Sequence, residues 1–97
     1  MTLPELCERA AWWLEVKGWC QGAYSTSDGA HCVIGAIWAV SNAMGVRPAV
    51  WWDALHELAR RTGTDEPLFM WNDKPGRTVE EVLALLRDKL PVPVKEV

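Results

Sequence analysis

The stretch AHCVIGAIWAVSNAM, residues 30–44, decides the fold because it has almost no polar face. A helix that is apolar nearly all round must be covered on most sides by other elements. We therefore predict a central helix over these residues, with the rest of the chain packed around it. Gly35, flanked by Ala36 and Ala39, lets another backbone come close, at some cost in helix propensity. The segment is shorter than the roughly 20 apolar residues that cross a membrane.

Three more helices are expected, at 3–17, 48–62 and 79–90, from apolar residues at helical spacing. Thr2 and Thr78 each stand three positions before a Glu, which is the pattern of a capping box at a helix start. Glycine residues follow the first three helices and proline follows the last, as helix ends favour. The prediction is an all-α fold with four main helices around the central one.

The connections between these helices complete the expected organisation. The polar loop before the central helix holds Ser27 and Asp28, either of which suits the capping position of that helix. The apolar run 68–71 is expected as a turn or a short helical piece that tucks under the core. Residues 1–90 then form one compact helical domain, and the proline-broken residues 91–97 form a mobile C-terminal tail.

Charge and cysteine content narrow the function classes. The net charge of −3 argues against general nucleic-acid binding, which needs Lys and Arg to neutralise phosphates. The N-terminal residues are acidic where a signal peptide has a basic region before its apolar run. We therefore expect a cytoplasmic protein without a membrane association, whose three cysteines are reduced thiols.

The seven tryptophans give the strongest indication of function. Trp12-Trp13 and Trp51-Trp52 are adjacent pairs within expected helices. Because successive helical residues diverge by roughly 100°, both members of a pair cannot face the core. At least two indoles should therefore lie at the edge of the core, where Trp residues often form contact surfaces. The alternative is that all four wrap the rim of a small core.

The string WNDKPGRTVEEV, residues 71–82, together with Gly18-Trp19, Gln21-Gly22 and the Cys32 to Ile37 segment, resembles a family of short uncharacterised proteins from actinobacteria and their phages. The Trp-Asn-Asp-x-Pro-Gly-Arg-Thr motif is the most specific part of this resemblance, which covers roughly residues 6–90. The family has no assigned activity, so the resemblance implies kinship and no mechanism. The doubled tryptophans distinguish this chain within it.

An enzymatic alternative rests on Cys32, near the expected start of the central helix, where a helix N-terminus lowers a thiol pKa. His31 or His56 would act as the base and Asp73 or Asn72 as the orienting group, as in a Cys-His-Asp arrangement. However, a small Cys within an apolar run is commonly buried and inert. No pair of cysteines or histidines has the spacing of a structural zinc site, so we expect no metal and no other cofactor.

The polar turn is the best candidate for a ligand-binding segment; it contains Asn72, Asp73, Arg77 and Thr78. These side chains offer hydrogen bonds, a planar guanidinium and a helix N-terminus that attracts anions. The structural alternative is that they fix an irregular loop against the core.

The function that these observations favour is a non-enzymatic interaction protein, with either a partner protein or a second copy of itself bound through tryptophan-bearing helix edges. By analogy with the family, a phage-encoded modulator of a host protein is one version of this. The second hypothesis is a small-molecule binder or Cys-dependent hydrolase. Its pocket would lie between the start of the central helix, with Asp28, His31 and Cys32, and the 72–78 turn.

Overall fold

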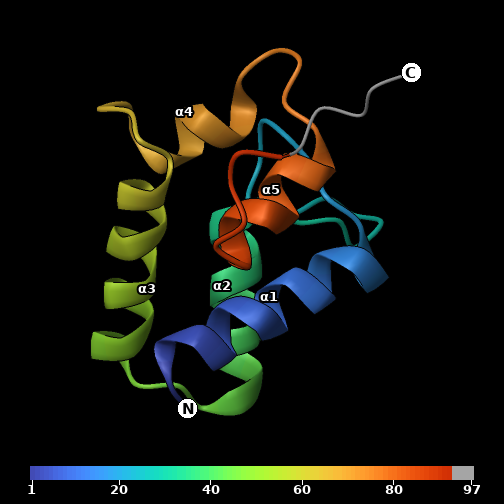
Figure 1. The fold of residues 1–97 in the computed structure, drawn as a ribbon. Helices are drawn as coiled ribbons and strands as arrows, with labels where there is room; N and C mark the ends of the chain where they lie inside the picture. The colour runs from blue at the N-terminus through green and yellow to red at the C-terminus, as the bar shows by residue number, and fades with distance from the viewer. Residues whose placement is uncertain (93–97) are drawn as a thin grey trace.

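The central apolar helix is present in the computed structural model, which describes residues 1–92 (Figure 1). Residues 1–92 contain five helices: α1 (Leu3–Lys17), α2 (Val33–Met44), α3 (Pro48–Arg61), α4 (Leu68–Asp73) and α5 (Val79–Leu86). Within the described residues there is no β-strand, only two isolated bridges in the loop before α2. The all-helical fold class is therefore confirmed.

The α2 helix begins at Val33, so the expected start at Ala30 is wrong. Residues 30–32 are extended because the loop before α2 folds back and pairs with them. The His31 N–H donates to the Gly18 carbonyl at 3.0 Å, and the His31 carbonyl accepts from the Cys20 N–H at 2.9 Å. Neither Ser27 nor Asp28 caps the helix; Cys32 does so, its sulfur accepting the Gly35 N–H at 3.3 Å.

Gly35 allows a backbone to lie directly against α2, as the sequence predicted. A Cβ at this position would stand 2.0 Å from the Tyr24 carbonyl oxygen. That carbonyl also accepts the Cys32 N–H at 3.1 Å, so it is held both to the start of α2 and against its surface. The loop between α1 and α2 is thereby packed onto the central helix.

The core lies where α1, α2, α3 and α5 meet, with α4 closing one end (Figure 1). Leu6, Leu14 and Ile37 are fully buried side chains from α1 and α2, and Leu58 and Leu85 come from α3 and α5. The capping box at the start of α5 is complete, with Thr78 and Glu81, whereas at the start of α1 Thr2 caps the helix by accepting the Glu5 N–H and its hydroxyl donates to the Glu5 carboxylate.

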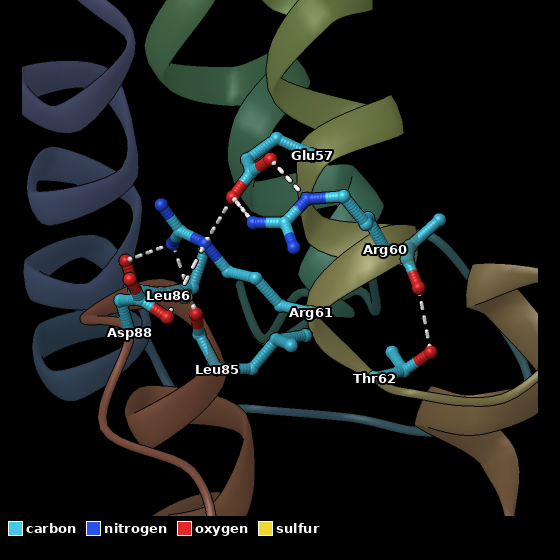
Figure 2. A network of polar contacts seen from close by, with 8 residues as sticks. Glu57, Arg60, Arg61, Thr62, Leu85, Leu86 and Asp88 are labelled. Carbon is cyan, nitrogen blue, oxygen red and sulfur yellow. Dashed lines mark hydrogen bonds and ion pairs between the residues drawn. The ribbon is translucent and has the colours of Figure 1, made fainter.

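The last helix ends at Leu86, four residues before its expected end. Asp88 takes a positive φ of 56°, and the Lys89 N–H turns back to the Ala84 carbonyl at 2.7 Å. Arg61 fixes this end of α5 from α3, since its Nη1 donates to the Leu85 and Leu86 carbonyls at 3.1 and 3.2 Å (Figure 2). A cation at a helix C-terminus is favourable, so Arg61 adds to the backbone bonds by which Asp88 and Lys89 close this end of α5.

Around Arg61 lies a group that we call the arginine cluster: Arg61, Glu57, Arg60 and Asp88. The Glu57 carboxylate accepts from Arg60 at 2.7 and 2.8 Å and from Arg61 at 2.9 Å, and Asp88 pairs with Arg61 at 3.8 Å (Figure 2). These bonds hold the pKa of Glu57 down to about 2, the hydrogen bond from Arg60 contributing most.

The expected short piece after α3 is the helix α4. Leu68 and Trp71 point into the core, while Phe69 and Met70 are half exposed. No helix in residues 1–92 combines the length and the apolar character needed to cross a bilayer. Of the expected mobile tail, residues 93–97 lie outside the described part of the chain.

Candidate functional site

The polar turn is organised around Asn72, the last but one residue of α4, whose side chain is completely buried. Its Oδ1 accepts from Trp19 Nε1 at 2.8 Å and from the Val33 N–H at 3.0 Å. Its Nδ2 donates to the Cys20 carbonyl at 3.2 Å and to Asp73 Oδ1 at 2.9 Å. We call these five residues the Asn72 hub. One amide thus joins α4, the loop before α2 and the first turn of α2.

Gln21 and Gly22 add three bonds on the outer side of the hub. Gln21 Nε2 donates to the Asn72 and Lys74 carbonyls, both at 3.0 Å, and the Gly22 N–H donates to Asp73 Oδ1 at 3.0 Å. The loop after α1 is therefore attached to the 72–74 segment along its length. Sequence reasoning identified Asn72 and Asp73 but missed Trp19 and Gln21 as their partners, because these lie some fifty residues away.

Arg77 and Thr78 serve the opposite side of the turn. The Arg77 guanidinium lies 3.9 Å from the centre of the Trp71 ring, and its Nε donates to the Trp71 carbonyl at 2.9 Å. Its Nη1 donates to Glu81 at 2.7 Å, and Glu81 completes the capping box with Thr78. Burial alone would raise the pKa of Glu81, but bonds from Thr78 and Arg77 lower it. All four turn residues therefore have structural partners.

A pocket of about 400 Å³ opens beside the hub. Its lining consists of Gly22, Ala23, Tyr24, Cys32, Phe69 and Asp73. Tyr24 and Phe69 are both half exposed, and Cys32 is buried. The pocket lies between the start of α2 and the beginning of the 72–78 turn, and its lining comes from the loop before α2, from the α2 cap residue Cys32 and from α4.

The residues of the enzymatic alternative do not form a triad. Cys32 and Asp73 both line the pocket, but His56 lies on α3, where its ring stacks on Trp52 with centroids 6.1 Å apart. His31 places Nδ1 at 2.8 Å from the Gly29 carbonyl and meets Trp13 edge-on. Burial raises the pKa of the Cys32 thiol although the Gly35 N–H at its sulfur opposes this. This environment favours the thiol over the nucleophilic thiolate.

Cys20 lies in the loop before α2. Burial is the largest cause that raises the pKa of its thiol, and the neighbouring Cys32, Asp73 and Asp28 raise it further. Among residues 1–92, no three His, Cys, Asp or Glu side chains gather in a way that would hold a metal ion.

The four tryptophans singled out in the sequence fall into two groups. Trp12 is 54 % exposed, and with Trp13 it borders a shallow hollow beside Val40, Ala43 and Met44. Trp13 is partly buried, with the Lys17 ammonium 5.7 Å from its ring centre. No ring contact within the described residues connects this group to Trp51 and Trp52.

Trp51 and Trp52 belong to a longer row of rings. Tyr24 meets Trp38 at 4.9 Å between centroids, Trp38 meets Trp51 at 6.5 Å, and Trp51 meets Trp52 at 4.8 Å. We call these four residues the aromatic stripe; they come from the loop, α2 and α3. Trp52 is 51 % and Tyr24 53 % exposed, so both ends are open to solvent. Tyr24 and Trp38 were not predicted, since an isolated aromatic has no period that marks it as a surface residue.

The chain belongs to DUF6197, a family of unknown function whose model matches residues 1–88. The match covers the full set of helices and leaves out only the residues after Asp88. No curated protein matches the chain, and no solved structure matches it.

Proposed function

We propose that this member of a family of unknown function is a small, non-enzymatic interaction protein that binds another polypeptide along the aromatic stripe. The single observation that supports this most is the uninterrupted row of four rings from Tyr24 to Trp52, open at both ends. Trp and Tyr are enriched among the residues that dominate binding energy at interfaces.

The surroundings of the stripe also favour a contact surface. Phe69 and Met70 on α4 are half exposed, and Phe69 shares a pocket with Tyr24. Large apolar side chains that lie together on a surface mark interaction sites more often than chance. The raised pKa of Cys32 and the distant place of His56 favour a binding role over thiol catalysis.

The experiment compares two tryptophans of equal exposure. Trp52→Gln changes the stripe, and Trp12→Gln changes the separate group on α1, with 51 % and 54 % of the residue exposed in the parent protein. A polypeptide partner recovered by affinity purification should be retained by Trp12→Gln and lost by Trp52→Gln. Equal loss in both variants would indicate general stickiness and overturn the assignment to the stripe.

Self-association is the other version of the same proposal. Light scattering over a dilution series separates the two versions, because a homodimer on the stripe dissociates on dilution and dissociates earlier in Trp52→Gln. A monomer at every concentration leaves a different polypeptide as the partner. The actinobacterial or phage origin, and a role as a phage modulator of a host protein, are further parts of this proposal that rest on the motif at 71–78.

The pocket beside the Asn72 hub favours a second candidate, a small-molecule binder or a Cys-dependent hydrolase. Iodoacetamide at pH 6 tests the hydrolase: a catalytic Cys32 would react much faster than Cys7 or Cys20. The raised pKa of Cys32 leads us to expect slow reaction instead.

A further inference from the structure

The two oxygens of the Asp73 carboxylate differ in their hydrogen bonding within the described residues. Oδ1 accepts from the Asn72 side chain at 2.9 Å and from the Gly22 N–H at 3.0 Å. Oδ2 accepts no hydrogen bond, and Asp73 forms no ion pair, within the part of the chain that the structure describes. Asp73 is exposed and lines the pocket. The bonds at Oδ1 therefore hold a charged oxygen in place for a donor from outside.

The rest of the pocket suits a cation on an alkyl chain. Tyr24 and Phe69 supply aromatic rings, whose faces attract ammonium groups, and both are about half exposed. Ala23 and Cys32 add apolar surface for methylene groups. The Asp73 charge also acts on Cys32 inside the pocket, since it is one of the causes that raise the pKa of that thiol. The net charge of the whole chain, −3, acts in the same direction at longer range.

We propose that this pocket binds a lysine side chain of the polypeptide that docks on the aromatic stripe. The pocket and the stripe share Tyr24, so a chain lying along the stripe passes the pocket mouth. Lysine fits better than arginine because its ammonium is a compact charge that one carboxylate oxygen satisfies, whereas a guanidinium pairs best with two. The lysine assignment rests on the proposed function, but the cation site is testable separately.

The pocket rim is fixed before any ligand arrives. The Tyr24 carbonyl is held by the Cys32 N–H and lies against Gly35, and Gly22 is tied to Asp73. A preformed site loses less conformational entropy on binding, so a small fragment of the ligand should occupy it alone.

The test titrates n-butylammonium, which has the four carbons and the ammonium group of a lysine side chain, into the protein while amide chemical shifts are recorded. The neutral 1-butanol is the matched probe of the same chain length. We expect saturable shifts at the Gly22, Phe69 and Asp73 amides with n-butylammonium, and weaker binding of the alcohol. Equal affinity for both probes would overturn the cation site.

Three variants separate the contributions. Asp73→Asn keeps an oxygen for the Gly22 N–H but removes the charge, and should weaken n-butylammonium binding about threefold to tenfold. Phe69→Leu should weaken the binding of n-butylammonium and leave the binding of the alcohol unchanged. Asp53→Asn removes the same charge from α3, away from the pocket lining, and should change nothing. Equal weakening by Asp53→Asn and Asp73→Asn would show attraction to net charge alone and overturn the proposal.

The test of the cation site can also be separated from the test of the proposed function. Trp52→Gln should bind n-butylammonium as the parent protein does, because Trp52 is not part of the pocket lining. If Trp52→Gln retains its polypeptide partner while n-butylammonium still binds, the stripe is wrong and the cation site stands. If the partner binds through Trp52 but Asp73→Asn leaves its affinity unchanged, the lysine assignment is wrong.

Discussion

Two polar groups join distant parts of this chain, and they do so by opposite means. The Asn72 hub uses one uncharged amide with no solvent exposure to connect α4 with the loop and the start of α2. The arginine cluster uses charged side chains, with Arg60 largely exposed, to connect α3 with the end of α5. The Asn72 hub positions the pocket and one end of the aromatic stripe. The arginine cluster lies on the α3–α5 side of the molecule.

The difference shows which contacts the fold depends on. A buried amide with four bonds has no alternative partner, so removing it leaves several polar groups unpaired. Partly exposed ion pairs contribute little to the free energy of unfolding, since water and salt screen the charges and can solvate either partner. We therefore expect stability to depend strongly on the Asn72 amide, which does not titrate, and the cluster to respond to pH more than to substitution of an exposed charge.

The largest effect is expected from Asn72→Ala. This change leaves Trp19 Nε1, the Val33 N–H and the Cys20 carbonyl without their partner in a buried site. We expect a loss of about 3–5 kcal/mol in the free energy of unfolding. Urea denaturation followed by tryptophan fluorescence measures it.

Two further variants make this result interpretable. Asn42→Ala removes an exposed amide from α2 and should alter stability little. Trp19→Phe removes the bond to Asn72 Oδ1, which keeps the Val33 N–H, together with one ring of an indole that packs on the core, and should cost about 1–2 kcal/mol. If Asn72→Ala costs no more than Asn42→Ala, the hub does not hold the loop.

Gly35→Ala should have the next largest effect on the free energy of unfolding. The test is whether the change destabilises or stabilises the protein. In an open helical site this change stabilises by up to about 1 kcal/mol through helix propensity. Here the new Cβ would stand 2.0 Å from the Tyr24 carbonyl oxygen, so the loop must move. We expect a net destabilisation of about 1–3 kcal/mol in the same urea experiment, together with altered amide shifts at Gly22 and Tyr24. A stabilised variant would mean that the loop is not packed on α2.

The fold was predictable from sequence where the signal is local. The apolar run over 30–44 indicated the central helix, which the structure begins at Val33, Thr2 and Thr78 marked two helix starts, and Gly35 indicated a close backbone. Each of these depends on residues within a few positions of one another. The same holds for Asn72 and Asp73, whose polar side chains stood out beside the buried Trp71.

The errors come from long-range contacts. Residues 30–32 look helical by composition, but pairing with the segment after α1 holds them extended. The last helix ends early because Asp88 turns the chain and because Arg61 donates to the Leu85 and Leu86 carbonyls, which lie twenty-four and twenty-five residues after it. The aromatic stripe was only half found, since its rings come from three elements and no periodicity relates them.

The pH dependence of the arginine cluster gives a smaller effect. Glu57 has a pKa lowered to about 2 in the folded protein, against 4.5 as its ordinary value. A lowered folded pKa stabilises above the unfolded value, and this stabilisation is lost as pH falls from about 4.5 towards 2. Glu57→Gln should therefore be less stable than the parent protein at pH 7 and should lose less stability over that window.

The comparison is made by thermal unfolding at pH 7, 4.5 and 2.5. Glu80→Gln is the matched control, because Glu80 is exposed on α5 and forms no ion pair within residues 1–92. It should follow the parent profile. A Glu57→Gln profile parallel to the parent one would show that the cluster does not contribute to acid sensitivity. Asn42→Ala and Trp19→Phe should also run parallel to the parent protein, since neither changes a titratable group.

Arg60→Gln should have the smallest effect on stability. It also tests the difference between the Asn72 hub and the arginine cluster most directly. Arg60 gives the largest contribution to the lowered pKa of Glu57, yet its side chain is 72 % exposed. Removing it should raise the pKa of Glu57, measured by carbon-13 NMR of the carboxyl group, and should lower the unfolding temperature at pH 7 and 0.15 M salt only slightly, because water and salt screen this exposed pair. Arg61 retains its bonds to Glu57 and to the end of α5, so the connection between α3 and α5 persists. A large fall in unfolding temperature would mean that the exposed pair carries stability, and the distinction between the two polar groups would then not hold.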